Sequence, residues 1–412
     1  MLFGFMRTCD DECLSGRLKS FPIKWGRFLY NGEMQLPVPS SDALLVSRAL
    51  ESLIREEIRA SEHWISFARF MELALYTKDL GYYSGVATKL GKGGDFTTAP
   101  EMTVLFGATL ASFASTLSLP KPLRVLEFGA DSGKLAEDFL RAAGDLGLEV
   151  ADYFILELSS DLRERQQQRL AEERQVTWLD TPPSSFTGLV LCNEVLDAMP
   201  VPLMVRKNDQ WWERGVAIDG DQFVFQDRSV DQALCNHIPD AADLPEGYLT
   251  EVHPRQEGFV RLLGDMLQAG EGGLAVLIDY GFPAREYFLP QRSSGTLMCH
   301  YRHHAHGDPF LHVGLQDITA HVNFTGLASV GLEHGLEVAG YMSQAAFLLS
   351  AGLPQWLEKS RPEDTALWLP LANAVQKLTS PAEMGELFKV LLLSSRIELS
   401  ESLINSDQSY RL

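Results

Sequence analysis

Short apolar segments alternate with longer amphipathic segments through the middle of the chain. The apolar segments have the length of buried strands, whereas the segments after them repeat apolar residues at three- and four-residue steps, as helices do. This alternation is typical of parallel strands joined by helices that cover both faces of a sheet. It predicts an α/β fold with strands at 124–128, 152–156, 188–192 and 274–278 and helices at 132–143 and 159–173.

The N-terminal part of the chain follows other patterns. Residues 41–76 have helical periodicity and predict two helices, the glycine-rich residues 81–100 predict a loop, and residues 101–117 predict a further helix. Residues 1–40 mix single aromatic residues with glycine, proline and charges, without a steady period. They predict a poorly ordered leader, with Met34 as an alternative start of the protein.

A β-rich insertion is expected within the sheet domain. Between about 202 and 255 the chain has a partly alternating, strand-like pattern, which includes the aromatic residues Trp211, Trp212, Phe223 and Phe225. We therefore expect three parts: a leader (1–40), an N-terminal helical region whose glycine-rich loop contributes to the functional site (41–120), and a sheet domain with the insertion (121–412).

Composition and charge narrow the functional class. With 45% hydrophobic and 22% charged residues the chain is typical of a globular protein, and no apolar run approaches the roughly 20 residues that span a bilayer. The net charge of −20 argues against nucleic-acid binding but suits a basic polypeptide partner. Five scattered cysteines indicate reduced thiols, and the acidic residues near the start do not fit an import signal, so we expect a cytoplasmic protein.

The first predicted strand runs into a glycine-bearing turn and then into a helix. Gly129 lets the backbone turn tightly, and Gly133 lets the helix begin with its free N–H groups facing an anionic ligand. The turn favours a nucleotide-type ligand. A purely structural turn is equally compatible with this motif alone.

The second predicted strand ends in Glu157, whose carboxylate suits the two hydroxyls of a ribose. The interval from Gly129 exceeds the roughly 20 residues of a dinucleotide-binding fold, which indicates a longer loop near 144–149. Because open α/β sheets bind ligands at the carboxyl ends of their strands, we favour a binding role over an ordinary surface carboxylate.

The third strand runs directly into Asn193, Glu194 and, three residues later, Asp197. If a helical turn forms here, the two carboxylates share one face. Two neighbouring carboxylates can hold a guanidinium group or a general-base proton. The alternative is that Asp197 only caps a helix.

Two further patterns do not support the chemistry that they suggest. The glycines of residues 85–98 lack the spacing of a phosphate-binding loop, and Gly93 occupies the position of the hydroxyl ligand to magnesium. A group of histidines lies in a loop-like segment without the helical spacing of a zinc site, namely His300, His303, His304, His306 and His312. We therefore predict no metal.

Nine motifs within residues 41–393 resemble those of one family. In order they are FMELALYTKDLGYYSG, GKGGDFTTAPEMTVLFG, LEFGADSGKLA, YFILELSSDLRERQ, LCNEVLDAMPV, LIDYGF, GTLMCHYRHH, GLQDITAHVNFT and PAEMGELFKV. With this set, the chain resembles the MidA-like S-adenosylmethionine-dependent methyltransferases, which include the mitochondrial complex I assembly arginine methyltransferase.

The resemblance implies a class I methyltransferase fold, which is Rossmann-like, with S-adenosyl-L-methionine as cofactor. The cofactor is implied to lie over Gly129 and Gly133 with its ribose at Glu157. The turn at Asn193 and Glu194 is implied to lie near the reacting centre, with Asn193 also on the cofactor. Further residues implied to line the cofactor or substrate pocket are Gly94, Asp95, Phe96, Thr97, Pro100, Glu101, Glu127 and Asp131.

The implied reaction is methyl transfer to an arginine of a partner protein, in which Glu194 and Asp197 orient the guanidinium. Asp317 and His321 either complete the pocket and receive a proton, or act only as a helix cap and a packed histidine. A homodimer is left open. Transfer to a small molecule is disfavoured, because the insertion and the acidic composition suit a polypeptide better.

One position departs from the family pattern. The family usually has glycine where this chain has Asp131, and a side chain there could either repel the methionine carboxylate or pair with its ammonium group. This departure defines the competing hypothesis, in which the protein binds cofactor and serves as a catalytically weak or inactive assembly factor for a respiratory-type complex.

Overall fold

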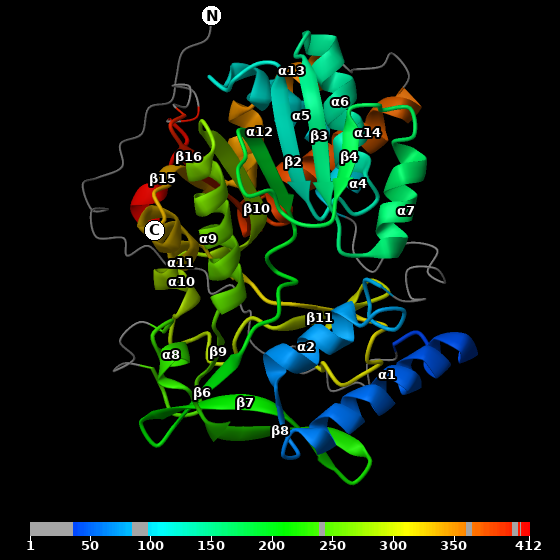
Figure 1. Ribbon diagram of the computed structural model, residues 1–412, viewed down its shortest axis with the longest axis vertical. Coiled ribbons are helices and arrows are strands. Elements are labelled where there is room, and N and C mark those ends of the chain that lie inside the picture. Colours follow the sequence, from blue (N-terminus) through cyan, green and yellow to red (C-terminus); the bar gives the residue numbers. More distant parts are fainter. Residues whose placement is uncertain (1–35, 85–97, 239–243, 360–364, 398–402, 404) are drawn as a thin grey trace, which may run out of the picture. The chain divides into compact units, whose positions relative to one another are not determined.

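An eight-stranded, mostly parallel sheet is the largest sheet of the computed structural model, which describes residues 36–84, 98–238, 244–359, 365–397, 403 and 405–412 (Figure 1). The strand order is β15-β16-β10-β5-β2-β3-β4, and β14 pairs with β10. The parallel strands are β2 (Leu123–Phe128), β3 (Val150–Leu156), β4 (Val176–Leu179), β5 (Gly188–Asn193), β10 (Gly273–Phe282) and β14 (Val322–Asn323). An antiparallel edge consists of β16 (Phe388–Ser395) and β15 (Glu337–Ser343).

Both faces of this sheet are buried. Leu189 and Leu191 of β5 belong to the hydrophobic cluster on one face, and Val190 and Cys192 belong to the cluster on the other. The first face is covered by α5 (Val104–Thr116), α6 (Lys134–Leu146) and α12 (Gln344–Ser350), and the second by α9 (Pro254–Ala269) and α11 (Phe324–Glu333). Burial on both sides explains why the strands are continuously apolar, and it confirms the predicted α/β class.

A second, antiparallel sheet contains the predicted β-rich insertion. Its strands are β1 (Ile65–Ser66), β7 (Gln210–Asp219), β6 (Leu203–Lys207) and β9 (Leu249–Glu251), with β8 (Gln222–Ser229) on the other side of β7. The helices α1 (Ser41–Ala60) and α2 (Phe67–Tyr76) pack on this sheet: Ile54 and Phe70 share a hydrophobic cluster with Val216 and Phe223. The N-terminal helices and the insertion, which are distant in sequence, therefore share one core.

The remaining elements are a divided helix, a three-stranded sheet and several further helices. The helix predicted at 101–117 is interrupted at Thr103, where the backbone is extended and the side chain accepts a hydrogen bond from Leu105 N, so α4 (Ala99–Met102) and α5 are separate. A three-stranded sheet is formed by β11 (Met298–Tyr301), β12 (His304–His306) and β13 (Asp317–Thr319). The other helices are α7 (Ser160–Arg169), α8 (Gln232–Cys235), α10 (Ala284–Tyr287), α13 (Leu353–Lys359), α14 (Thr365–Thr379), α15 (Met384–Leu387) and the 3-10 turn η1 (Ser409–Arg411).

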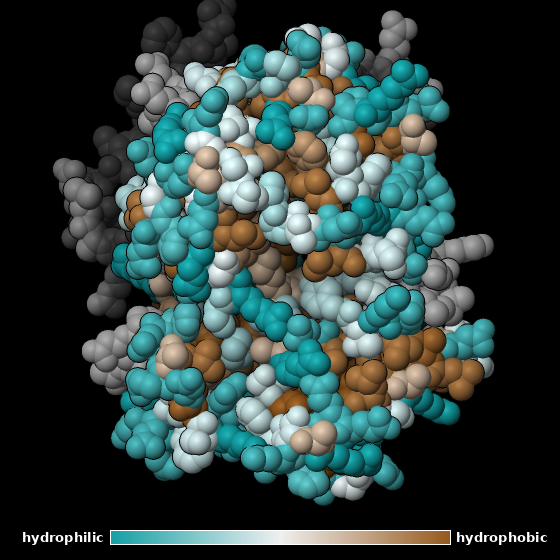
Figure 2. Space-filling view, in the orientation of Figure 1, coloured by the Kyte–Doolittle hydropathy of each residue, from teal (hydrophilic) through white to brown (hydrophobic). Residues whose placement is uncertain are grey.

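The face of the molecule seen in Figure 2 is mainly hydrophilic, with apolar side chains gathered over α1. On that helix Leu45 is 63% exposed, whereas Leu50, Ile54 and Ile58 are fully buried. The burial of one side of α1 follows its amphipathic spacing. Within the described ranges, no helix has the length and apolar character needed to cross a membrane.

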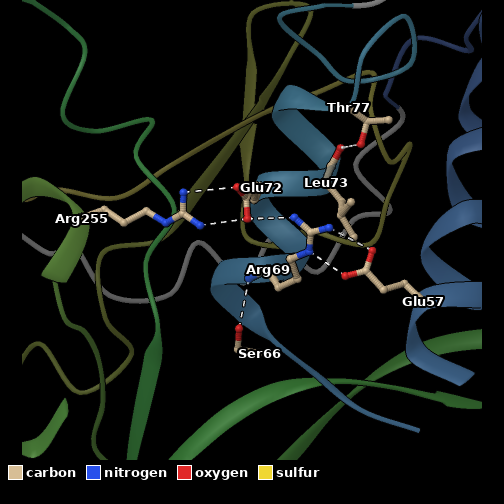
Figure 3. Close-up of polar contacts among 7 residues, drawn as sticks. All are labelled: Glu57, Ser66, Arg69, Glu72, Leu73, Thr77 and Arg255. Carbon is tan, nitrogen blue, oxygen red and sulfur yellow. Dashed lines mark hydrogen bonds and ion pairs between the residues drawn. The ribbon is translucent and has the colours of Figure 1, made fainter. Parts of the chain in front are cut away.

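An ion network joins α1, α2 and α9 (Figure 3). Arg69 of α2 binds Glu57 of α1 through two hydrogen bonds of 2.6 and 3.1 Å, and it also binds Glu72 at 3.0 Å. Glu72 in turn accepts hydrogen bonds of 2.8 and 3.3 Å from Arg255 of α9. Burial opposes ionisation of Glu72, but the hydrogen bonds from both arginines outweigh it and lower its pKa.

We expect Glu72→Gln to lower the free energy of unfolding by about 1 kcal/mol at pH 7, because the partly exposed pairs it removes contribute weakly. Since the folded state lowers the pKa of Glu72, this contribution is present above the ordinary value of about 4.3 and is lost as the pH falls through the lower folded value. Urea unfolding at pH 7 and pH 3 tests this. Glu56→Gln, on the exposed side of α1, is the control, and an equal loss at both pH values would contradict the expectation.

Candidate active site

The turn between β2 and α6 has a left-handed backbone at three of its five residues. Gly129 has φ +63°, Asp131 has φ +46° and Gly133 has φ +81°. Gly133 is the N-cap of α6. Because it has no side chain, it makes no capping hydrogen bond to the first N–H groups of the helix. Asp131 thus has the left-handed backbone that glycine adopts most easily.

Alanine should have opposite effects at Gly129, in the turn, and at Gly144, within α6. In Gly129→Ala the alanine would have to keep a left-handed backbone, and its Cβ would lie 3.0 Å from Val195 Cγ2. We therefore expect a loss of roughly 1–2 kcal/mol in unfolding free energy. In the control Gly144→Ala, within α6, the Cβ meets nothing within 4 Å, and we expect a gain of roughly 0.5–1 kcal/mol. Chemical denaturation of both variants measures the difference, and changes of the same sign would refute this account of the turn.

Glu157 directly follows β3, beside the glycine turn. Its Oε1 accepts a hydrogen bond from Ser159 N at 2.9 Å, and its Oε2 accepts one from Gln166 Nε2 at 2.9 Å. Burial raises the pKa of Glu157, although both hydrogen bonds favour the ionised form. The carboxylate is thus held in one orientation at the carboxyl edge of the sheet, the edge at which open α/β sheets bind ligands.

The turn after β5 brings the predicted acceptor-binding residues together. Glu194 has φ +53°, an uncommon conformation for a residue with a side chain, and its Oε1 accepts hydrogen bonds from Asn193 Nδ2 at 3.2 Å and from Ala99 N at 3.3 Å. Burial, followed by the charge of Asp197, raises the pKa of Glu194 to about 8. No helix forms over these residues, so Asp197 is not the helix cap that the sequence also allowed.

Side chains from other elements hold this turn. Asp279 of β10 accepts hydrogen bonds from Leu196 N at 2.9 Å and Asp197 N at 3.2 Å. The carbonyl oxygens of the turn are also bound, since Gln256 Nε2 donates to Leu196 O at 2.8 Å and Tyr76 OH donates to Ala198 O at 2.9 Å. These contacts explain how the strained backbone of Glu194 persists.

Sequence reasoning missed these supporting residues. Asp279 lies in the LIDYGF motif and Tyr76 in the FMELALYTKDLGYYSG motif, so both belong to the family motifs but had no assigned role. Gln256 lies in none of the nine motifs. Gln256 is therefore the one residue of these three that no sequence motif indicated.

Two oxygen atoms of the turn are buried without a partner among the described residues. They are Asn193 Oδ1 and Asp197 Oδ1. The other carboxylate oxygen of Asp197 accepts a hydrogen bond from Tyr280 OH at 2.5 Å. Burial raises the pKa values of both Asp197 and Asp279, and the nearby carboxylates of Asp197 and Glu194 raise that of Asp279 further. Unsatisfied buried acceptors beside carboxyl groups suit a ligand that donates hydrogen bonds and carries positive charge.

The predicted residues Asp317 and His321 lie around the same turn. Asp317 begins β13 and accepts a hydrogen bond from Tyr83 OH at 3.0 Å, so it does not cap a helix. His321 stacks on Phe282 with ring centroids 5.3 Å apart, and burial lowers the pKa of His321 to about 3. The histidine is therefore neutral near pH 7. The backbone between them is tied to the turn by Ala320 N, which donates to Asp197 O at 3.0 Å.

The helix α4 joins the first and third turns. Glu101 accepts a hydrogen bond from Ser132 Oγ, and Ala99 N donates to Glu194, with Pro100 buried between them. Asp131 is exposed, yet partial desolvation by the surrounding protein, together with the charge of Glu101, raises the pKa of Asp131 to about 6. The four remaining predictions for this segment lie outside the described residues: Gly94, Asp95, Phe96 and Thr97.

Glu127 has a different environment from the other predicted cofactor residues. It is 2% exposed, and its Oε2 accepts a hydrogen bond from Tyr153 OH at 2.8 Å. Burial raises the pKa of Glu127 to about 8.

In the part of the chain that the structure describes, no three His, Cys, Asp or Glu side chains lie together as the ligands of a metal ion would.

These turns lie at the carboxyl ends of three adjacent strands, β3, β2 and β5, as in α/β proteins that bind nucleotide-type ligands. Residues 105–342 match the model of a family of S-adenosyl-L-methionine-dependent methyltransferases. A crystal structure from Burkholderia thailandensis, bound to S-adenosyl-homocysteine, has 47% sequence identity and a TM-score of 0.86, and the match covers 92% of this chain and 100% of that chain. The chain belongs to this methyltransferase family, and the predicted class I fold and cofactor are confirmed.

Relatives in animals have lower identity. The Drosophila melanogaster protein named protein arginine methyltransferase NDUFAF7 homolog, mitochondrial, is 26% identical over 409 residues, which cover 88% of this chain and 89% of that protein. The Danio rerio protein arginine methyltransferase NDUFAF7, mitochondrial, is 25% identical over 374 residues, which cover 82% of this chain and 85% of that protein.

Both relatives are named as mitochondrial proteins, which contradicts the predicted cytoplasmic location. The prediction rested on the few scattered cysteines and on acidic residues near the start, which do not fit an import signal. The cysteine pattern indicates that thiols stay reduced, and it does not separate the cytoplasm from other reducing compartments.

The arrangement fits S-adenosyl-L-methionine. The left-handed turn at Gly129 and Gly133 lets backbone approach the ligand, and the Glu157 carboxylate can accept hydrogen bonds from a ribose. The unpartnered Asn193 Oδ1 supplies a further acceptor at the adjoining turn, among the residues that the structure describes.

Proposed function

We propose that this methyltransferase methylates an arginine side chain of a partner protein. The observation that carries the proposal is the pair of acidic groups at Glu194 and Asp197, with Asp197 Oδ1 buried and unpartnered among the described residues. A guanidinium offers several N–H donors and a permanent positive charge, which satisfy both groups at once. The names of the animal relatives support the same acceptor.

We propose that the cofactor is held by the turn from Gly129 to Gly133, by Glu157 and by Asn193. When bound, S-adenosyl-L-methionine supplies the electrophilic methyl group. Glu194 and Asp197 orient the guanidinium, and their charge concentrates its lone pair on the reacting nitrogen. A carboxylate oxygen of Glu194 then takes the proton that this nitrogen releases, for which its pKa of about 8 is suited.

Asp317 and His321 have supporting roles in this proposal. Tyr83 OH donates to Asp317, and the ring of Tyr83 stacks on that of Tyr76, which binds the acceptor turn. His321 is a neutral ring beside Tyr280, the donor to Asp197. These contacts keep the acceptor turn dry and fixed. A catalytically inactive assembly factor is the weaker candidate, because Asp131 preserves the glycine-like backbone of the cofactor turn.

Labelled S-adenosyl-L-methionine tests the proposal. The protein is incubated with the labelled cofactor and a host lysate, and the labelled protein is analysed by mass spectrometry for methylarginine. We expect label on arginine of a basic polypeptide, in keeping with the net charge of −20. Label on another residue type or on a small molecule would overturn the arginine assignment. Cofactor binding without any labelled product would favour the assembly factor.

A further inference from the structure

Gln166 of α7 connects the two turns that we assign to the cofactor. The residue is fully buried, and its side-chain nitrogen donates to Asp131 O at 2.9 Å and to Glu157 Oε2 at 2.9 Å. Its side-chain oxygen accepts a hydrogen bond from Trp178 Nε1 at 2.9 Å. One buried amide thus contacts the turn after β2, the carboxylate after β3 and a residue of β4.

The contact with Trp178 determines which way the amide of Gln166 points. An indole N–H can only donate, so the atom facing it must be the amide oxygen. The amide nitrogen must then face Asp131 O and Glu157, and both are acceptors. Each of its two hydrogens has one partner, so the network is satisfied in this orientation alone.

The packing of α7 against the glycine turn has the same effect. A Cβ built on Gly133 would lie 3.4 Å from both Cα and Cγ of Gln166. Gln166 therefore lies in direct van der Waals range of the turn. Any shift of Gln166 would be transmitted directly to the turn and to Glu157.

We propose that Gln166 is a positioning residue for the cofactor, which sets the separation and orientation of the glycine turn and the Glu157 carboxylate. This inference rests on the proposed assignment of those two elements to the cofactor. Because Gln166 occupies Oε2 of Glu157 on one side and Ser159 N occupies Oε1, the carboxylate presents its remaining lone pairs in one fixed direction. The residue then acts on cofactor affinity and not on the chemical step.

Calorimetric titration with S-adenosyl-homocysteine tests this inference without any acceptor. We expect Gln166→Met, which keeps the length but loses all three hydrogen bonds, to weaken binding about tenfold. The matched control is Gln344→Met in α12, where an equally buried glutamine donates one hydrogen bond to Leu378 O. The control should lose thermal stability but keep wild-type affinity.

Steady-state kinetics gives the second readout. Gln166→Met should raise the KM for S-adenosyl-L-methionine about tenfold while kcat stays within about twofold. Trp178→Phe, which removes only the donor that orients the amide, should shift affinity in the same direction by about threefold. If Gln166→Met does not fold, the affinity of Trp178→Phe tests the inference in its place.

Equal affinity of Gln166→Met and Gln344→Met, or a change confined to kcat, overturns the inference. Glu157→Gln distinguishes this failure from a wrong site assignment. If Glu157→Gln weakens binding and Gln166→Met does not, only the role of Gln166 is wrong. If neither variant changes affinity, the cofactor lies elsewhere and both assignments fall.

Discussion

Glu194→Gln is expected to lower methyl transfer about a hundredfold while cofactor affinity stays within about twofold of wild type. Glutamine keeps the shape but not the charge, so a guanidinium loses a charge-assisted hydrogen bond of up to roughly 3 kcal/mol. The nitrogen also loses its proton acceptor. Single-turnover rates at saturating cofactor, with titration of S-adenosyl-homocysteine on the same sample, separate the two quantities.

The pH dependence of the reaction follows from the same residue. Because the pKa of Glu194 is about 8, its carboxyl group is ionised in only about a tenth of the free protein molecules at pH 7. Since the ionised form binds the guanidinium and accepts the proton, kcat/KM should rise about tenfold from pH 7 to pH 9 and then level off. This rise should disappear in Glu194→Gln.

Two variants make the test of Glu194 specific. Glu213→Gln replaces another carboxyl group whose pKa is raised by burial, but in β7 of the antiparallel sheet, and should keep the wild-type rate. Asp197→Asn should lower the rate in the same way as Glu194→Gln, because it removes the negative charge of a carboxyl group that would bind the guanidinium. The Oδ1 of that carboxyl group has no partner among the described residues. An unaltered rate per folded molecule in Asp197→Asn, with only its melting temperature lowered, would assign Asp197 to structure.

Glu157→Ala should weaken cofactor binding by about 10- to 100-fold, since charge-assisted hydrogen bonds to a ribose are worth roughly 1.5–3 kcal/mol. Calorimetry with S-adenosyl-homocysteine measures this loss. At saturating cofactor, methyl transfer should recover most of its rate.

Asp180→Ala is the matched control for Glu157. Asp180 directly follows β4, the strand beside β3, but its carboxylate is largely exposed and binds Arg163. Its replacement should leave cofactor affinity unchanged. If both variants weaken binding equally, or if Glu157→Ala has no effect, the ribose assignment is wrong.

Interactions between residues close in sequence were predictable. The central strands were recognised from apolar runs, and β2, β3, β5 and β10 include every residue predicted for them. The glycine turn was recognised because a left-handed backbone after a strand requires residues such as Gly129 and Gly133. Because the carboxyl ends of parallel strands meet at one edge of a sheet, the order of strands along the chain was enough to predict Glu157 and Glu194 at that edge.

The packing of distant segments was not predictable in the same way. The two-residue strand β1 has no pattern of its own, and it exists because Ile65 and Ser66 pair with Val216 and Gly215 of β7. Likewise, the sequence of β16 does not tell whether its long apolar run is parallel or antiparallel to β10. Strand direction depends on where the chain re-enters the sheet, which no local period records.

By itself, the sequence determined the α/β class, the glycine turn and the acidic residues at the strand ends, because each depends on local spacing or on the topology of parallel strands. The tertiary structure alone decided which buried polar groups support them: Gln166 between the glycine turn and Glu157, and Asp279, Gln256 and Tyr76 around the turn after β5. A buried donor or acceptor must be satisfied by whatever element packs against it. Those partners come from segments far apart in the chain, so they are known only once the segments have met.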